Sequence, residues 1–168
     1  PDGPADEPGN LGSGWVGFDF AQAFGCPVKI INDAAMQALG SYEGGRMLFL
    51  GLGTGLGSTL VADMVLVPLD LGCLPFRDTT FADWLGKDGL KRHGKAAWLE
   101  AVAEAVRTLK KAVAADHVVL GGGNAAEVEV LPEGVVRGGN EKAFEGGFRL
   151  WEEAAPIHEG PPLAWKML

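Results

Sequence analysis

The pattern of hydrophobic and polar residues changes period several times along this chain, and each change predicts a new element. Residues 19–24 form a short amphipathic segment. A β-branched run over 27–31 ends at Asn32-Asp33, and the helix-forming segment 34–40 follows. The order predicts a strand over 27–31, a turn, and a helix over 34–40.

The middle of the chain predicts three short strands in series. Apolar runs cover 46–50 and 58–62, and the glycine-rich stretch 51–57 separates them. Two such runs around a glycine-rich turn are typical of an antiparallel hairpin. A third apolar run over 65–69 predicts a further strand, whose end Pro68 confines to a sheet edge or a strand terminus.

The last third of the chain predicts three helices and one strand. A Ser/Thr-x-x-Asp/Glu capping pattern introduces a short helix over 81–85. Apolar residues then recur at three- and four-residue steps over 98–113, which predicts a long amphipathic helix. The run 117–120 predicts a strand, and 141–155 predicts a final helix that Pro156 must end. Strands and helices in this order predict an α/β domain.

Composition and charge then narrow the possible partners. Of 168 residues, 47% are apolar and 21% are charged, so the chain can bury a core. A formal net charge of −8 without a basic stretch argues against a nucleic-acid partner. An apolar run of eighteen residues is absent, so no membrane contact is expected. Cys26 and Cys73 lie far apart outside any CxxC pair, which favours a reducing cytoplasm.

The glycine-rich turn at 51–57 is the first candidate for chemistry. Glycines let backbone N–H groups crowd around phosphate oxygens. A dinucleotide-binding G-x-G-x-x-G does not fit, because the sixth position counted from Gly51 is Leu56 and a strand follows. A Walker loop does not fit either, since it needs a lysine directly after its last glycine and no lysine lies between Lys29 and Lys87. The turn is therefore a phosphate-binding hairpin to which Thr54 adds a hydroxyl donor, or a plain tight hairpin.

Asp33 is the second candidate, because it lies where a predicted strand ends and a helix begins. Open α/β sheets bind ligands at this edge, and a carboxylate there could accept a proton from a substrate hydroxyl. The alternative is that Asp33 caps its helix. Asn32 beside it could hydrogen-bond a polyol or merely finish the turn.

Three further features remain open at this level. The glycines at 121–123 could let a flat ring lie against bare backbone, or could form a loop with unusual dihedral angles. Asp70 and Cys73 face either a site or solvent. The three histidines are scattered and lack the spacing of metal ligands, so no metal site is predicted.

Three sequence motifs occur in an order that is typical of a known protein family. Val-Lys-Ile-Ile-Asn-Asp-Ala-Ala over 28–35 precedes Leu-Gly-Leu-Gly-Thr-Gly-Leu-Gly-Ser over 50–58, and Val-Val-Leu-Gly-Gly-Gly-Asn over 118–124 follows. Asn10-Leu11 with Trp15 adds an Asn-Leu-x-Trp-like approach to a sugar pocket. The chain resembles the ROK family of sugar kinases, in particular its glucokinase and polyphosphate-glucokinase branch. The resemblance implies an RNase H-like fold of the actin/hexokinase ATPase type, with a mixed sheet and flanking helices.

The resemblance also implies roles for individual residues. Asp33 would be the general base that takes a proton from the 6-hydroxyl of glucose or a related hexose. The phosphoryl donor would be ATP or polyphosphate, with Mg²⁺ on the phosphates. The sugar side would comprise Asn10, Asn32, Asp70 and Cys73, and the phosphate and nucleotide side Gly53, Thr54, Gly55, Gly121, Gly122 and Gly123.

The sequence departs from the family pattern in three places. The Asp-x-Gly-Gly-Thr loop of the first lobe is absent, so the chain is expected to be the C-terminal part of the kinase pattern. Asp70-Leu71-Gly72-Cys73 stands where the family has Glu-x-Gly-His. The cysteine-rich zinc motif is also missing, so no structural zinc is expected. These departures support an alternative, a truncated and catalytically inactive module for sugar or nucleotide binding or for oligomerisation.

The expected organisation has three parts. Residues 1–44 would form an N-terminal segment that carries the Asn-Asp motif, 45–155 a kinase-like lobe, and 156–168 a loosely ordered tail. A domain without its neighbouring lobe exposes an apolar face, and such faces mark association sites. A homo-oligomer is therefore expected.

Overall fold

The computed structural model describes residues 3–4, 6–7, 11–63, 65–152 and 166–167. The chain divides into two compact units, residues 1–32 and residues 33–168. The expected division at residues 44 and 155 stays a prediction.

The N-terminal unit contains the helix α1, Phe20–Phe24, within the short amphipathic segment. Asp19 caps it, because its side chain accepts a hydrogen bond of 2.8 Å from the Gln22 backbone N–H. The strand predicted over 27–31 is wrong, since these residues form neither helix nor strand. A β-branched run becomes a strand only beside a hydrogen-bonding neighbour, and none of the described strands pairs with this run.

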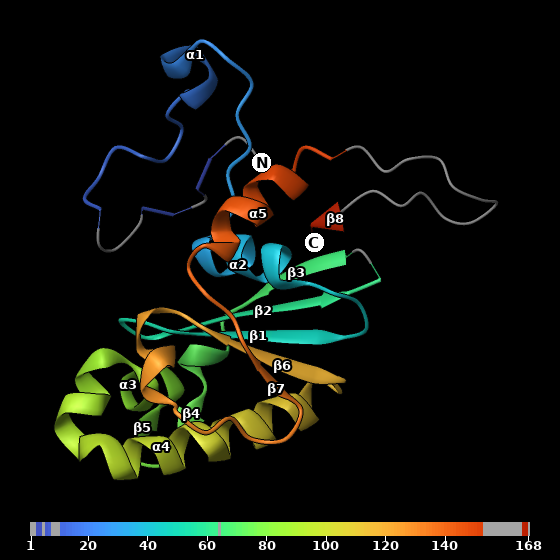
Figure 1. Cartoon of the computed structure of the whole chain (residues 1–168). Helices are drawn as coiled ribbons and strands as arrows, with labels where there is room; N and C mark the ends of the chain where they lie inside the picture. Colours follow the sequence, from blue (N-terminus) through green and yellow to red (C-terminus); the bar gives the residue numbers. More distant parts are fainter. Residues whose placement is uncertain (1–2, 5, 8–10, 64, 153–165, 168) are drawn as a thin grey trace. The chain divides into compact units, whose positions relative to one another are not determined.

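The larger unit is built on a sheet in the order β7-β6-β1-β2-β3-β8 (Figure 1). β1 and β2 form the antiparallel hairpin that the sequence predicts, and the predicted third strand, β3, pairs antiparallel with β2. β6 runs parallel to β1, and β7 runs parallel to β6. β8 pairs in parallel with β3 at the other edge. The strands are β1 Met47–Leu52, β2 Leu56–Ala62, β3 Val65–Leu69, β6 His117–Gly121, β7 Val135–Arg137 and β8 Lys166–Met167.

Helices cover both faces of this sheet. In Figure 1, α2 and α5 lie on one face, and α3 and α4 lie on the other. A small hairpin of β4 and β5 precedes α3. The helices are α2 Asp33–Ser41, α3 Phe81–Leu85, α4 Lys87–Ala112 and α5 Lys142–Arg149, with 3₁₀ turns η1 Leu71–Cys73 and η2 Gly123–Glu127, and the hairpin strands are β4 Pro75–Phe76 and β5 Thr79–Thr80.

Strand β1 is buried on both faces, which is why its sequence is continuously apolar. Leu48 and Leu50 belong to the core that α3 and α4 cover, together with the fully buried Trp98. The Trp98 indole N–H donates to the Leu85 carbonyl at 3.0 Å, so the ring is buried without an unpaired donor. Phe49 points to the opposite face, toward α2, where its ring lies against Gly121.

Helices α2 and α5 approach each other through glycine. A Cβ atom at Gly40 would collide with the Lys142 carbonyl oxygen, and one at Gly146 would collide with the Met36 carbonyl oxygen. The close approach of the two backbones therefore requires glycine at both positions.

Two predicted helices have different bounds in the structure. α5 ends at Arg149 rather than at residue 155, because its last turn tightens to an i→i+3 bond from the Trp151 N–H to the Phe148 carbonyl oxygen. Residues 153–155 and Pro156 lie outside the described residues. α4 begins at Lys87, well before the apolar stripe, and Gly94 with φ 78° and ψ 161° breaks its helical path.

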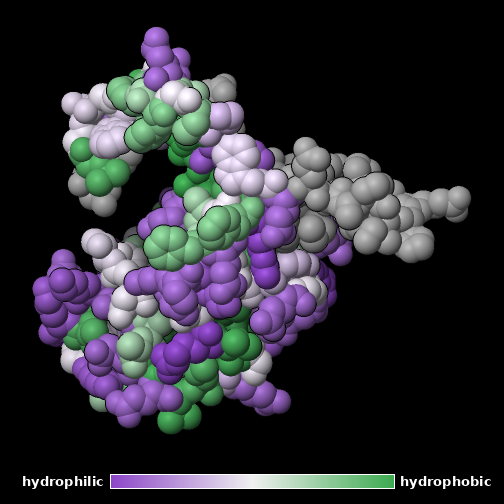
Figure 2. Space-filling model, turned by 45° about the horizontal axis from the view of Figure 1, so that its top comes forward, coloured by the Kyte–Doolittle hydropathy of each residue, from purple (hydrophilic) through white to green (hydrophobic). Residues whose placement is uncertain are grey.

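The visible face in Figure 2 is mostly hydrophilic over the larger unit, with apolar patches between the polar side chains. Phe144 and Phe148 on α5 are 76% and 75% exposed, and Trp151 is 50% exposed. The expected homo-oligomer stays a prediction. In the described part of the chain, no helix combines the length and the apolar character that crossing a membrane requires.

Candidate functional site

Two glycine turns lie at the same end of the sheet. β1 and β6 are parallel with Gly51 opposite Gly121, so both strands end at one edge (Figure 1). The β1–β2 turn, Gly53–Gly55, leaves β1 there, and Gly122-Gly123-Asn124 follows β6. The carboxyl edge of parallel strands is where open α/β sheets bind ligands.

The two turns are fastened to each other at the Gly53 carbonyl oxygen. This oxygen accepts a hydrogen bond of 3.0 Å from the Asn124 side-chain amide and one of 2.9 Å from the Lys87 N–H at the start of α4. The Gly53 N–H donates to the Gly55 carbonyl oxygen at 3.1 Å. Three hydrogen bonds to the Gly53 backbone thus fix the position of the turn. Sequence reasoning did not assign Asn124 a role, because a contact across 71 positions leaves no local signal.

The donors that remain on the first turn belong to Thr54 and Gly55. Within the described part of the chain, neither backbone N–H group donates to a carbonyl oxygen. The Thr54 side chain is exposed. Backbone N–H groups and a hydroxyl in one turn form an anion-binding concavity without any charged side chain.

The glycines at this edge fall into two kinds. Packing requires Gly122, because its backbone has φ 82° and ψ 165° and a Cβ atom would lie 2.5 Å from the Leu52 carbonyl oxygen. Packing also requires Gly121, whose Cβ would lie 2.5 Å from the Phe49 ring. Gly53 and Gly123 differ. Among the described glycines, they alone combine an ordinary φ with no neighbouring atom within 4 Å of a Cβ.

This pair has no reason in the fold to be glycine. A side chain at Gly53 or Gly123 would project into open space without backbone strain. Both residues lie at the edge where the turns meet, and Asn124, next to Gly123, contacts Gly53. Glycine at such positions leaves the backbone accessible to a ligand that comes close to it. This observation favours the ligand interpretation at Gly53 and Gly123. Gly122, in contrast, has the unusual dihedral angles that the alternative for 121–123 expects.

Helix α3 supports the first turn from below. Cβ atoms at Gly55 and Gly72 would each lie 3.3 Å from the Ala82 Cβ, so small residues pack α3 tightly on the hairpin. Thr80 caps α3 by accepting from the Asp83 N–H at 3.2 Å. Hydrogen bonds from the Thr79 and Thr80 hydroxyls lower the pKa of Asp83, so the carboxylate stays ionised at the N-terminus of the helix.

Asp33 lies at the same edge as the glycine hairpin. It is the first residue of α2 and is exposed. The following residue, Ala34, packs against β2, where a Cβ at Gly57 would lie 2.9 Å from the Ala34 Cβ. The Asp33 Oδ1 atom accepts from the Ala34 N–H at 2.8 Å. Asp33 is thus an exposed first helical residue that accepts from the next N–H, whereas a capping side chain precedes the helix and accepts from an N–H two or three residues further on.

Of the four residues predicted to bind the sugar, the structure places Asp70 and Cys73 close to each other. Ser58 fixes the start of η1, because its hydroxyl donates to the Leu69 carbonyl oxygen at 2.9 Å and accepts from the Leu71 N–H at 3.0 Å. Asp70 and Cys73 therefore lie beside the hairpin, and both are exposed. The Cys73 thiol donates to the Asp70 carbonyl oxygen at 2.9 Å.

The other two candidates for sugar binding are Asn32 and Asn10. Asn32 is exposed and is the last residue of the N-terminal unit. Asn10 lies outside the described residues. Among the residues that are described, no group of three His, Cys, Asp or Glu side chains could hold a metal ion.

No protein-family model and no curated protein matches the chain. Solved structures do. The inorganic polyphosphate/ATP-glucomannokinase from Arthrobacter sp. strain KM is similar over 75% of this chain, at 24% identity and a TM-score of 0.63. A ROK family glucokinase from Streptomyces griseus, in complex with glucose and AMPPNP, is similar over 76% of this chain, at 16% identity and a TM-score of 0.56.

A third similar structure is a ROK family protein from Streptococcus pneumoniae TIGR4 in complex with sucrose, at 14% identity, a TM-score of 0.58 and 77% coverage of this chain. The chain spans 57% of the glucomannokinase, 69% of the glucokinase and 68% of the sucrose complex. The predicted fold is confirmed: the chain has the mixed α/β fold of ROK sugar kinases.

Proposed function

We propose that this chain forms the phosphate- and nucleotide-binding part of a sugar kinase that phosphorylates the 6-hydroxyl of glucose or a related hexose. The observation that supports it most directly is the pair of open glycines, Gly53 and Gly123, on two turns that Asn124 joins. Two joined turns with accessible backbone suit a ligand that carries several phosphates. The solved ROK structures supply the analogy, since one of them holds glucose and AMPPNP.

In this proposal the first turn holds the phosphoryl group that is transferred. The N–H groups of Thr54 and Gly55 and the Thr54 hydroxyl donate to its oxygens as charge develops during transfer. Gly53 contributes no donor, because its N–H is bonded to Gly55. Its role is to leave space and to offer its carbonyl oxygen to Asn124 and Lys87, which fix the turn in position.

The second turn lies beside the nucleotide. Gly121 and Gly122 let β6 end tightly against β1, and Gly123 leaves the surface open beyond them. When polyphosphate replaces ATP, the chain of phosphates would lie along the same edge. Mg²⁺ would arrive with the phosphates of the donor, as sites for this ion commonly use one or two carboxylates and the substrate itself.

Asp33 is the proposed general base. The sugar 6-oxygen attacks the terminal phosphorus, the bond from phosphorus to the leaving oxygen breaks, and the hydroxyl proton moves to the Asp33 carboxylate. The Oδ1 atom is held by the Ala34 N–H, which orients the carboxylate. Asp70 and Cys73 are the proposed contacts to the other sugar hydroxyls, and the sugar-binding roles of Asn10 and Asn32 stay predictions from the sequence.

A second candidate function is a binding module without turnover. The thiol of Cys73 is engaged with the backbone of Asp70, and a thiol is a weak hydrogen-bond donor to a sugar. Such a module would bind a nucleotide or a sugar at the same edge of the sheet but would transfer no phosphoryl group.

A coupled assay for glucose 6-phosphate distinguishes the two functions. The chain is supplied with glucose, Mg²⁺ and either ATP or polyphosphate, and ATP binding is titrated calorimetrically on the same preparation. The kinase proposal predicts turnover that Asp33→Asn removes, with ATP binding retained. Asp88→Asn, an exposed aspartate on α4, serves as the matched control and should leave turnover unchanged.

The other outcomes distinguish the binding module from the kinase and test the role of Asp33. ATP binding without turnover would support the binding module. Turnover that survives Asp33→Asn would remove Asp33 from the role of base. Glucose is titrated in the same way, and the absence of turnover together with the absence of ATP, polyphosphate and glucose binding would contradict both functions.

A further inference from the structure

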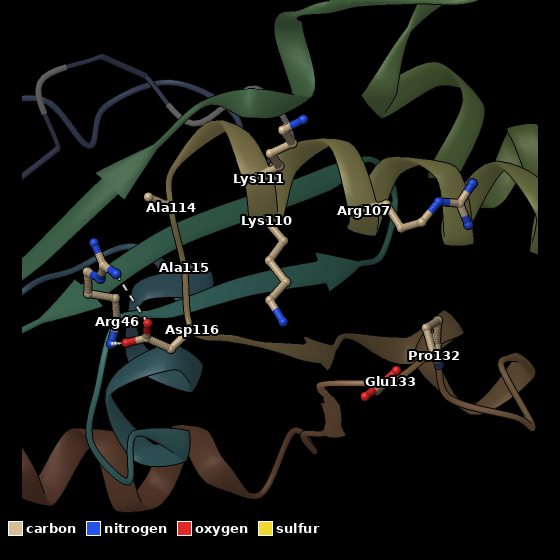
Figure 3. Close-up of a pocket in the computed structure, with 9 residues that line it drawn as sticks. All are labelled: Arg46, Arg107, Lys110, Lys111, Ala114, Ala115, Asp116, Pro132 and Glu133. Carbon is tan, nitrogen blue, oxygen red and sulfur yellow. Dashed lines mark hydrogen bonds and ion pairs between the residues drawn. The ribbon is translucent and has the colours of Figure 1, made fainter.

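A second hollow lies at the opposite end of the sheet, where β1 and β6 begin. A pocket of about 640 Å³ is formed by the start of β1, the end of α4 and the segments that lead into β6 and β7 (Figure 3). β1 is six residues long. At about 3.3 Å per residue, roughly 20 Å of strand separates this pocket from the glycine turns. It is therefore a different site.

The pocket is basic in an acidic protein. Basic side chains outnumber acidic ones around it, although the chain has a formal net charge of −8. The pocket contains four of the 14 lysines and arginines of the whole chain. The charged lining residues are Arg46, Arg107, Lys110, Lys111, Asp116 and Glu133.

Three of the cations lie within about one turn of each other near the end of α4. Arg107, Lys110 and Lys111 stand at positions i, i+3 and i+4, where like charges repel and destabilise a helix. Lys110 and Lys111 lie in the last turn, where the helix dipole favours cations. Arg107 lies before that turn, so the dipole does not account for it.

The acidic residues leave this charge largely uncompensated. Asp116 is committed to Arg46, because its carboxylate accepts from the Arg46 N–H at 2.8 Å and from the guanidinium at 3.2 Å. These bonds lower the pKa of Asp116. Among the described residues, no carboxylate forms an ion pair with Arg107, Lys110 or Lys111.

The side chains are placed around one space. Figure 3 shows Lys110 extending from α4 toward the segment of Glu133, with Arg46 on one side and Arg107 on the other. Lys111 points outward from the rim. A small anion in this space would have ammonium and guanidinium donors on several sides, and these form strong charge-assisted hydrogen bonds with phosphate oxygens.

We propose that this pocket binds a small multivalent phosphate, at a site separate from the glycine turns. The ligand is a compact oxyanion of the pyrophosphate or phosphomonoester class, held by Lys110 with Arg107, while Lys111 adds positive charge at the rim. Glu133 opposes it by charge repulsion. The proposal does not depend on the proposed kinase function, because it involves none of the same residues.

Calorimetric titration of the whole chain tests the site, with pyrophosphate and glucose 6-phosphate as separate probes. Lys110→Gln/Lys111→Gln should weaken binding about tenfold or more, since the loss of Lys110 removes a charged hydrogen bond and the loss of Lys111 removes a cation at the rim. Glu133→Gln should strengthen binding. The control is Lys91→Gln/Arg92→Gln, which removes two exposed cations from the same helix outside the pocket. Circular dichroism checks that each variant is folded.

The two probes distinguish the two sources of phosphate chemistry. Preference for pyrophosphate supports an inorganic phosphate chain, and preference for glucose 6-phosphate supports a phosphorylated metabolite. Failure of both probes to saturate overturns the proposal, as does equal weakening in the control variant. Loss of binding in Thr54→Val with no loss in the lysine variant would place the phosphate at the glycine turns and also overturn it.

Discussion

The two ends of the central sheet present different kinds of hydrogen-bond donor to an anionic ligand. At the carboxyl end of β1 and β6, the donors are backbone N–H groups and a threonine hydroxyl on turns that glycine keeps open. At the amino end, the donors are long cationic side chains around a pocket. The first end is fixed by hydrogen bonds within the chain, whereas the second end consists of cationic side chains, three of them from the last turns of α4.

The difference shows which end of the sheet holds ligand-binding groups in a defined position. The Gly53 carbonyl oxygen is held by two donors from different elements, so the first turn has a defined position. A defined position is what phosphoryl transfer requires, because catalysis there rests on alignment and charge stabilisation. Arginine and lysine side chains with many rotamers suit recognition of an anion better than the alignment of a reaction.

The largest effect is expected for the base. Asp33→Asn should reduce turnover about 10²- to 10⁴-fold, since an amide cannot accept the hydroxyl proton. The affinity for ATP, measured by calorimetry, should stay within the range of the parent chain. A parallel loss of ATP affinity would show that Asp33 acts on binding. It would then contradict the distinction between a carboxyl end that aligns the reaction and an amino end that only binds an anion.

The next effect concerns stability at the carboxyl end. Gly122→Ala should lower the free energy of unfolding by about 1–3 kcal/mol, because its dihedral angles belong to a region that only glycine occupies readily. The Cβ would also meet the Leu52 backbone at 2.5 Å. Urea unfolding followed by circular dichroism measures the change. Unchanged stability would mean that this turn is not fixed as described.

The neighbouring residue gives the matched control for that experiment. Gly123→Ala should leave the unfolding free energy nearly unchanged, because nothing lies within 4 Å of its Cβ and its φ is ordinary. The same variant should bind ATP several-fold more weakly, since the methyl group occupies the approach to the backbone. Equal ATP affinity in Gly123→Ala and the parent chain would contradict the role given to the open glycines.

The smallest effect is expected at the amino end. The Arg46 N–H, and then its guanidinium, lower the pKa of Asp116, so the ionised form stabilises the fold. That contribution is complete above the pKa of an unfolded aspartate, about 3.9, and is lost as the pH falls through the lower folded value. Asp116→Asn should therefore be slightly less stable than the parent at neutral pH, and the difference should vanish in strong acid. Urea midpoints at both pH values measure it.

Much of the fold could be predicted from the sequence. Local patterns identify the hairpin of β1 and β2, the strand β3 and the capped helix α3, because each depends on neighbouring residues. The strand predicted over 27–31 fails, since its apolar pattern says nothing about whether another strand lies beside it. The break in α4 at Gly94 was also missed, because the residues before it are polar and carry no apolar stripe.

The candidate site shows the same limit. Glycine turns and Asp33 could be read from motifs, but the sequence could not separate the glycines that packing requires from those that it does not. That distinction depends on Phe49 and Leu52, which lie on another strand. The Asn124 bond to Gly53 and the shared pocket of Arg46 and Arg107 likewise join residues that are distant in the sequence.

The most direct test of the central claim is an amide-resolved NMR titration of the whole chain with AMPPNP and Mg²⁺. The account predicts that the largest shift changes fall on the N–H groups of Thr54, Gly55 and Gly123, with small changes at Lys110 and Arg107. Saturating changes centred on Lys110 and Arg107, with Thr54, Gly55 and Gly123 unmoved, would contradict it.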